Sequence, residues 1–321
     1  MQLDKRVHPE LKTFLSAMPE SYLSRENIVE SRLVMKNMHK NEVVTIENVT
    51  VTERFITGPS DAPDVRIRIY EPTERHSLLP AILYIHGGGF ITGSIETYDT
   101  RCQMLVSHLD CLVVSVGYRL APEHPYPAGV EDCYTALEWL AANAAELDID
   151  LSRLAVHGTS AGGGLTAAVS LLARDRKGPK IAFQMPLYPM IDNRCILPSN
   201  DEIIDARVWN GPQNHRAWEM YLGPHYADAT AIYAAPLHAE DYRNLPPTYT
   251  FIGDLDPFRD ESIEYIARLT KAGVPTEFHL YPGCFHGFEN MVPHAEISQR
   301  AIENYLFAFK KAFDKAALPT T

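Results

Sequence analysis

A serine flanked by small residues follows an apolar segment that is typical of a buried strand. Gly158-Thr159-Ser160-Ala161-Gly162 matches the pattern G-x-S-x-G, with RLAVH before it and an alanine-rich stretch after it. In a strand–turn–helix of this kind the serine adopts strained backbone geometry, and glycines allow strand and helix to approach closely. Ser160 is therefore a candidate nucleophile. The same residues could also form a glycine-rich helix start with a capping serine.

Consecutive glycines follow a second apolar segment, AILYI, in the sequence His86-Gly87-Gly88-Gly89. Such a turn leaves backbone N–H groups free to meet a developing negative charge, so we expect an oxyanion hole built with the N–H of Ala161. A phosphate-binding loop is the rival interpretation, but the spacing fits neither G-x-G-x-x-G nor a P-loop, and no lysine follows. His86 should brace its turn by hydrogen bonding without exchanging protons.

Candidates for a base and an acid lie in the C-terminal third of the chain. Asp256 ends the segment TYTFIGDLD, and His286 follows FHLYPGCF, so both follow segments that read as strands. The order serine, acid, histidine is the order found in α/β hydrolases, where the acid and the histidine lie on loops after late strands. Asp254 and Asp260 compete with Asp256 for the role of acid, with helix capping and surface charge as their alternative roles.

The elements that must position these residues read as an α/β fold. AILYI, CLVVSV, RLAVH, IAFQM and TYTFI are continuous apolar runs, as expected for strands buried on both faces of a parallel sheet. Helical periodicity lies between them, so we expect right-handed βαβ units. Before them, Val65, Ile67 and Ile69 alternate with Arg66 and Arg68, which predicts a hairpin or meander with one solvent-facing side.

Two further segments depart from this alternation. Leu11, Phe14, Leu15 and Met18 predict one helix and residues 28–38 a second, before the first strand. Residues 191–244 contain tryptophan and tyrosine among proline, asparagine and histidine, with weak helical periodicity. We expect residues 1–45 and 191–244 to form a cap or lid, and residues 46–190 with 245–321 to form the catalytic domain.

Five motifs, taken in order, resemble those of the hormone-sensitive-lipase-like esterases, the bacterial family IV, in its GTSAG branch. They are HGGG at 86–89, YRLAPEHP at 118–125, GTSAGG at 158–163, DPFRDE at 256–261 and HGF at 286–288. The resemblance implies an α/β-hydrolase fold with a mostly parallel eight-stranded sheet and a helical cap. It places the acid directly before Pro257, at Asp256, and implies that short- to medium-chain esters are the substrates.

Three positions depart from the family pattern. Gly117 stands where the family more often has aspartate, which puts the bracing of the following loop in doubt. Thr159 replaces the commoner aspartate and marks the GTSAG subtype. Cys284, close to His286, is unexpected, and either packing or a minor redox role is open for it.

These residues together predict a serine carboxylesterase. Ser160 attacks the carbonyl carbon, His286 removes its proton, Asp256 orients the imidazole, and Gly87 to Gly89 with Ala161 bind the oxyanion. The implied partner is a small-molecule ester, and no metal or organic cofactor is implied. Two alternatives stay open: an amidase, deacetylase or lactone hydrolase on the same triad, and a noncatalytic small-molecule receptor of the same fold.

Composition excludes other classes of function. The net charge of −12 and the absence of a basic run argue against nucleic acid as a partner. Residues 1–20 carry charges throughout, which disfavours a secretory signal, and no apolar stretch is long enough for membrane insertion. Five cysteines without a C-x-x-C pair favour unpaired thiols and a cytoplasmic location. The last helix and last strand could support a homodimer.

Overall fold

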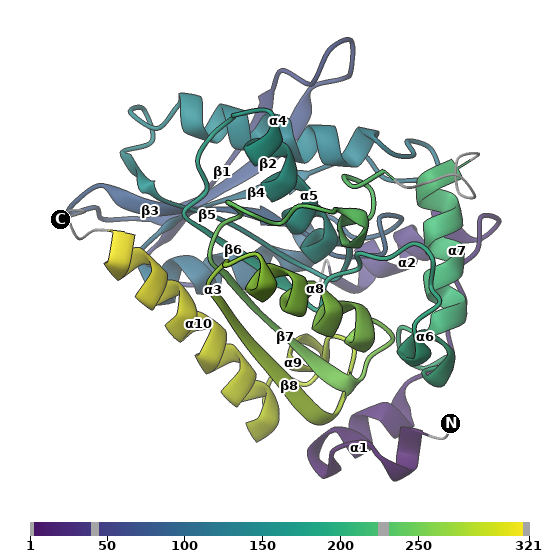
Figure 1. Cartoon of the computed structure of the whole chain (residues 1–321). Helices are drawn as coiled ribbons and strands as arrows, with labels where there is room; N and C mark the ends of the chain where they lie inside the picture. Colours follow the sequence, from purple (N-terminus) through teal and green to yellow (C-terminus); the bar gives the residue numbers. More distant parts are fainter. Residues whose placement is uncertain (1–2, 40–44, 224–230, 317–321) are drawn as a thin grey trace.

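A twisted eight-stranded sheet forms the centre of the computed structural model, which describes residues 3–39, 45–223 and 231–316 (Figure 1). The strand order is β1-β2-β4-β3-β5-β6-β7-β8. β2 pairs antiparallel with β1 and β4, and all other pairs are parallel. The strands are β1 Val49–Ile56, β2 Val65–Pro72, β3 Leu79–Ile85, β4 Leu112–Gly117, β5 Ile149–Thr159, β6 Phe183–Leu187, β7 Thr248–Leu255 and β8 Thr276–Phe285. The predicted α/β fold with a mostly parallel sheet is confirmed.

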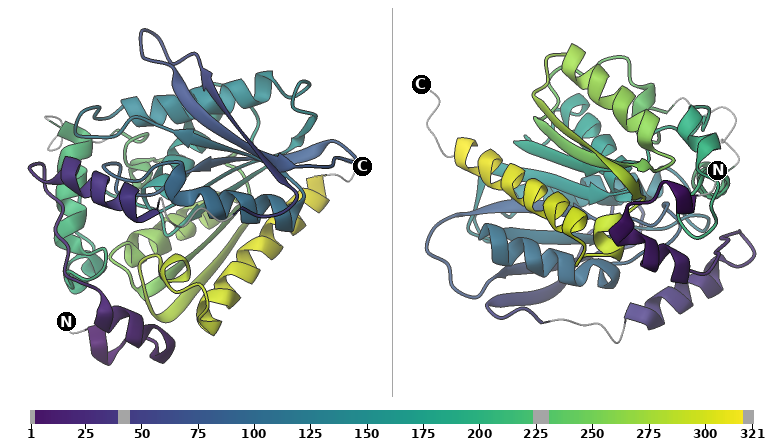
Figure 2. Two further views of the ribbon diagram at one scale, coloured as in Figure 1. Left: turned by 180° about the vertical axis from the view of Figure 1, so that it is seen from behind. Right: turned by 90° about the horizontal axis from the view of Figure 1, so that it is seen from below.

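Helices cover both faces of the sheet (Figure 2). α3 and α10 pack together on one face, and α4, α5 and α8 cover the other. The longer helices are α1 Pro9–Ala17, α2 Ile28–His39, α3 Asp99–Leu109, α4 Ala128–Ala142, α5 Ala161–Asp175, α7 Gly211–Leu222, α8 Arg259–Lys271 and α10 Glu296–Ala316. The shorter ones are η1 Leu3–Lys5, η2 Glu96–Tyr98, α6 Pro198–Glu202, η4 Pro236–His238 and α9 Phe288–Met291.

Burial follows the sequence pattern in the inner strands and departs from it at one edge. Every residue of β3 and β6 is buried, as continuous apolar runs predict. In β2, Val65, Ile67 and Ile69 are buried while Arg66 and Arg68 lie on the other side. β1 is mostly exposed along both of its sides, so the predicted single solvent-facing side holds for β2 and not for β1.

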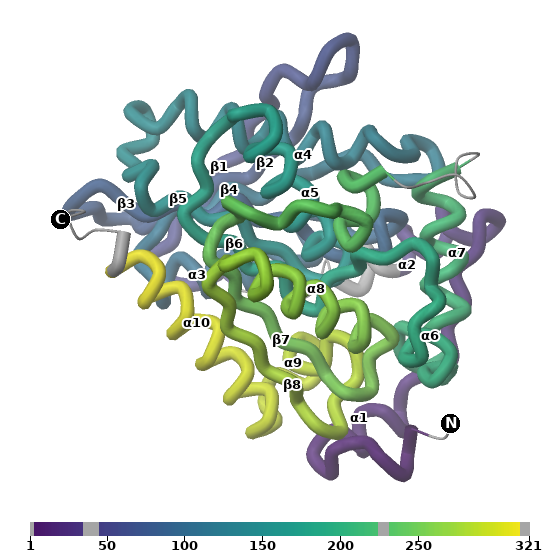
Figure 3. The backbone as a smooth tube through the Cα atoms, viewed as in Figure 1, coloured from purple at the N-terminus to yellow at the C-terminus, as the bar shows by residue number. Residues whose placement is uncertain are grey.

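The chain leaves the sheet after β6, runs through α6 and α7, and returns at β7 (Figure 3). The N-terminal segment lies against this insertion, since the Ser21 N–H donates to the Ala206 carbonyl at 2.9 Å and the Leu23 N–H donates to Gln213 Oε1 at 3.2 Å. The predicted boundary at residue 45 borders residues 40–44, which lie outside the described residues, as do residues 224–230 of the insertion.

Within the described ranges, no helix combines the length and apolar character needed to cross a bilayer. The five cysteines are buried and unpaired.

Candidate active site

Ser160 occupies a sharp turn between β5 and α5. Its backbone angles are φ 58° and ψ −122°, a conformation that L-residues rarely adopt. The Ser160 N–H donates to the Leu187 carbonyl at 3.0 Å, which ties the turn to the end of β6. A Cβ atom on Gly162 would lie 2.1 Å from the Ile85 carbonyl oxygen, and one on Gly158 would lie 2.7 Å from the same oxygen. Glycine at both positions therefore lets the turn pack against β3.

Three side chains form a continuous hydrogen-bonded chain at this turn. Ser160 Oγ lies 2.9 Å from His286 Nε2, and His286 Nδ1 lies 2.7 Å from Asp256 Oδ2. The carboxylate can only accept, so the Nδ1–H donates to Asp256, which leaves Nε2 to accept the Ser160 hydroxyl proton. Asp256 is fully buried, while Ser160 and His286 each keep 7% exposure. The geometry allows the serine proton to move to the imidazole.

The topology explains why residues so distant in sequence meet. Ser160, Asp256 and His286 directly follow β5, β7 and β8, whose carboxyl ends share one edge of the parallel sheet. The two competing acids accept hydrogen bonds from other backbone N–H groups. Asp254 accepts the Gly283 N–H at 2.5 Å, and Asp260 accepts the Ser199 N–H at 2.8 Å.

The glycine turn after β3 lies beside the serine. Gly88 and Gly89 have φ values of +123° and +61°, which favour glycine. The Gly88 carbonyl accepts the Thr92 N–H at 2.8 Å, and His86 Nδ1 lies 2.9 Å from the Gly87 carbonyl. Among the described residues, no protein acceptor receives the N–H groups of Gly88 and Gly89. Together with the N–H of Ala161 at the start of α5, they can receive an anion.

His86 holds this turn from behind. Its ring stacks on Tyr118 at 4.2 Å and 17°, and the Tyr118 hydroxyl donates to the His86 carbonyl at 3.0 Å. Burial lowers the pKa of His86 to about 4, so its ring is neutral near pH 7. Although Gly117 lacks the carboxylate common in the family, Arg119 braces the loop through Asp132, with its Nη2 2.7 Å from Oδ1.

Aromatic rings enclose His286 on several sides. Tyr188 and Phe258 lie edge-on to the imidazole with centroids at 5.0 Å and 5.1 Å, and the Trp209 centroid lies at 6.3 Å. Sequence reasoning assigned no role at the site to Tyr188 or Phe258. Their positions offered a signal, because Tyr188 directly follows β6 and Phe258 lies two residues after Asp256.

Cys284 lies two residues before His286, near the end of β8. Its thiol is buried, with Sγ 3.7 Å from the Pro282 carbonyl, and burial raises its pKa. A thiol of raised pKa forms little thiolate, which favours a packing role over a redox role. In the part of the chain that the structure describes, no three His, Cys, Asp or Glu side chains cluster as metal ligands would.

Comparison with known proteins places the chain in a family. Residues 82–290 match the family described as alpha/beta hydrolase fold. The carboxylesterase NlhH of Mycobacterium tuberculosis is 35% identical over 309 residues, covering 95% of this chain and 96% of that protein. A solved bacterial heroin esterase superimposes with a TM-score of 0.91 at 38% identity, covering 96% and 98% of the two chains. The esterase LipW of Mycobacterium marinum gives 0.90 at 33% identity, covering 97% and 98%. The chain therefore belongs to the alpha/beta hydrolase fold family, and the resemblance to hormone-sensitive-lipase-like esterases is confirmed.

Proposed function

We propose that this chain is a serine carboxylesterase in which Ser160 forms an acyl-enzyme with short- to medium-chain esters. The observation that carries the proposal is the hydrogen-bonded chain from Ser160 through His286 to Asp256, on a fold shared with esterases. A serine that served only as a helix cap would not need a hydrogen bond to a buried histidine that is itself bonded to a buried aspartate. A noncatalytic receptor would not require the strained turn that presents Ser160 to a ligand.

In the acylation half, Ser160 Oγ attacks the ester carbonyl carbon as His286 Nε2 takes its proton. Buried Asp256 keeps the Nδ1–H tautomer and stabilises the imidazolium that forms. The oxyanion meets the N–H groups of Ala161 and of the turn from Gly87 to Gly89. The imidazolium then gives its proton to the departing alkoxide, and the bond from the carbonyl carbon to the alcohol oxygen breaks.

In the deacylation half, water takes the place of the alcohol. His286 removes a proton from water, whose oxygen attacks the acyl carbon. The second oxyanion meets the same N–H groups, the Ser160 Oγ–acyl bond breaks, and the proton returns to Ser160. The products are a carboxylic acid and free enzyme.

The N-terminal segment and the insertion are proposed to form a cap that sets substrate size. Trp209 supports this proposal, since its Cη2 would lie 2.5 Å from a Cβ on Gly89 and its ring lies near His286. Phe90, which directly follows Gly89, stacks on Tyr221 of α7 with the ring centroids 4.0 Å apart. Large aromatic side chains so close to the reacting atoms favour short and medium acyl chains over long ones.

A location in the cytoplasm and a homodimer are also proposed. The location is supported by five unpaired cysteines, and the dimer by exposed Leu280 on edge strand β8 and Phe307 on α10. Light scattering on the purified chain tests the dimer.

The function is tested by hydrolysis of p-nitrophenyl esters from acetate to laurate by wild type and Ser160→Ala. We expect wild type to prefer the short and medium members and Ser160→Ala to lose measurable turnover. A lactone and a p-nitroanilide of the same acyl chain are assayed in parallel, because faster anilide or lactone turnover would favour the amidase or lactonase alternative. Equal ester rates for the two proteins would refute the proposal.

A further inference from the structure

A buried ion pair lies behind His286, outside the triad. Arg101 Nη2 on α3 lies 2.7 Å from Glu289 Oε1 on α9, with side-chain exposures of 7% and 0%. Burying two charges costs free energy that their attraction does not always offset, so replacement by apolar residues is often tolerated elsewhere. A buried pair next to an active site therefore suggests a role other than stability.

The ion pair is connected to His286 in two ways. Glu289 lies three residues after His286, so the pair fixes the short segment that leaves the imidazole. The Tyr188 hydroxyl donates to the same oxygen, Glu289 Oε1, at 2.7 Å. The Tyr188 ring in turn lies edge-on to the imidazole at 5.0 Å and 77°. Arg101, Glu289 and Tyr188 thus form a chain of contacts that ends on the His286 ring.

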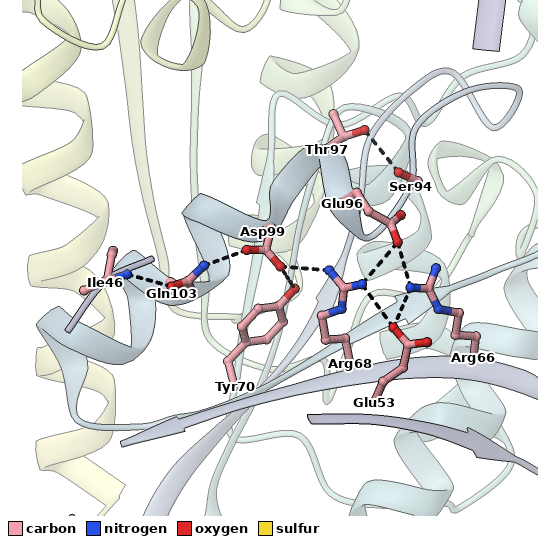
Figure 4. Close-up of polar contacts among 10 residues, drawn as sticks. All are labelled: Ile46, Glu53, Arg66, Arg68, Tyr70, Ser94, Glu96, Thr97, Asp99 and Gln103. Atoms are coloured by element: carbon pink, nitrogen blue, oxygen red, sulfur yellow. Dashed lines mark hydrogen bonds and ion pairs between the residues drawn. The ribbon is translucent and has the colours of Figure 1, made fainter. Parts of the chain in front are cut away.

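Side chains of β2 hold the segment that leads into α3 (Figure 4). Arg68 donates to Asp99 Oδ1 at 2.9 Å and to Glu96 at 3.2 Å, and Arg66 donates to Glu96 at 2.7 Å. The Tyr70 hydroxyl also donates to Asp99, at 2.9 Å. Side chains of β2 thus hold the residues just before Arg101, which contacts Glu289.

We propose that Arg101 and Glu289 are positioning residues for His286, acting through Tyr188 and through the segment that joins His286 to Glu289. This inference rests on the proposed function, because it concerns the orientation of the general base. Neither residue touches the reacting atoms. The pair places opposite charges behind the imidazole, so removing one charge leaves the other to act on the imidazolium that forms during catalysis.

The other titratable groups around the pair stay uncharged near neutral pH. They are Tyr84, Tyr98, Cys102, His157, Tyr281, Cys284 and Tyr305, together with Tyr188 itself. Burial raises the pKa of each tyrosine and of both cysteines, to about 12 for Tyr305, and lowers that of His157 to about 3. Asp256 and Ser160 face His286 directly. A shift in the acidic limb of the pH–rate profile when Arg101 or Glu289 is changed therefore does not come from a change of charge on these surrounding groups.

The first test is Tyr188→Phe, which removes one hydroxyl and keeps the ring. We expect kcat to fall about 10-fold with KM nearly unchanged, because a misplaced base slows chemistry more than binding. Tyr134→Phe is the matched control, since Tyr134 lies on α4, outside the proposed cap, with its ring 4.7 Å from the Arg176 guanidinium, and it should keep wild-type kcat. Rates are counted per active site titrated with a p-nitrophenyl phosphonate, so unfolded protein does not contribute.

The second test removes one charge at a time and measures the acidic limb of the pH–rate profile, the range in which the rate falls as the pH is lowered. In Glu289→Gln the unpaired Arg101 disfavours imidazolium, so the limb should move to lower pH, and in Arg101→Gln the unpaired Glu289 should move it to higher pH. A purely structural role would not give opposite shifts. Unchanged kcat in Tyr188→Phe, or limbs that stay fixed or move in one direction, would overturn the proposal. Where a charge variant does not fold, Tyr188→Phe decides. The activity of Ser160→Ala is measured separately, so failure of the ester-hydrolase assignment can be distinguished from failure of this proposal.

Discussion

Gly89 and Trp209 meet without room for a side chain between them. A Cβ atom on Gly89 would lie 2.5 Å from Trp209 Cη2 and 3.1 Å from Cζ2. Gly89 belongs to the turn that follows β3, and Trp209 belongs to the insertion between β6 and β7. The group that we propose to bind the oxyanion and a ring that we propose to limit the acyl chain are therefore in direct contact.

Gly89→Ala should reduce turnover strongly. Its φ of +61° strains an L-residue, and the new methyl group would push the turn or Trp209 out of place. Loss of one oxyanion donor lowers kcat by about 10² to 10³-fold, which is the expected range. Gly273→Ala is the matched control, because Gly273 also has positive φ but no atom within 4 Å of the added carbon. A comparable loss of kcat in both variants would contradict the oxyanion role of the turn.

Trp209→Ala should shift the preference toward longer acyl chains. Removing the indole opens space beside Gly89 and His286, so kcat/KM for laurate should rise relative to acetate. The measurement is the ratio of kcat/KM values across the p-nitrophenyl ester series. Trp139→Ala controls for loss of a tryptophan. The Trp139 ring is half-buried, and Arg54 Cζ lies 6.0 Å from its centroid. An unchanged ratio in Trp209→Ala would remove this residue from the acyl site.

Asp256→Asn should lower kcat by about 10⁴-fold, because the amide no longer holds the imidazole in the tautomer that accepts the serine proton. Asp254→Asn is the comparison, since Asp254 accepts the Gly283 N–H and lies two residues away. It should lose far less activity. Steady-state kinetics on one ester decides between the two carboxylates, and a larger loss in Asp254→Asn would contradict the assignment of the acid.

The residues that we propose as nucleophile, acid and base could be predicted from the sequence because each follows a segment with a clear strand pattern. Ser160, Asp256 and His286 directly follow β5, β7 and β8, and parallel strands bring such positions to one edge. Local pattern and topology were therefore sufficient to propose Ser160 and His286, but not to choose among the aspartates. Asp254 and Asp260 could be set aside only through the family resemblance, and the structure shows their separate partners.

The support behind the triad could not be predicted in the same way. Arg101 and Glu289 are 188 residues apart, and nothing in either local sequence indicates the other. Tyr188 reaches Glu289 through a contact that exists only in the packed core. The exposure of β1 is also a tertiary property, since an alternating segment carries no information about how many layers will cover it.

The free energy of unfolding should fall with acid more steeply in wild type than in His86→Asn. Burial lowers the folded-state pKa of His86 to about 4, against about 6.5 when unfolded. As the pH falls from about 6.5 to about 4, the unfolded chain binds a proton that the native chain does not, so stability is lost, on the order of 3 kcal/mol. Urea unfolding at several pH values in this window measures it, and parallel curves for the two proteins would contradict the prediction.

The central claim is that Ser160 forms the covalent bond to substrate, and a phosphorylating inhibitor tests it most directly. Diethyl p-nitrophenyl phosphate should release one p-nitrophenol per chain and add one diethylphosphoryl group. Peptide mass mapping should place that group on Ser160, and His286→Ala should be labelled far more slowly, since Ser160 lies 2.9 Å from His286 Nε2. Stoichiometric labelling of another residue, or unhindered ester hydrolysis by fully labelled protein, would contradict the account.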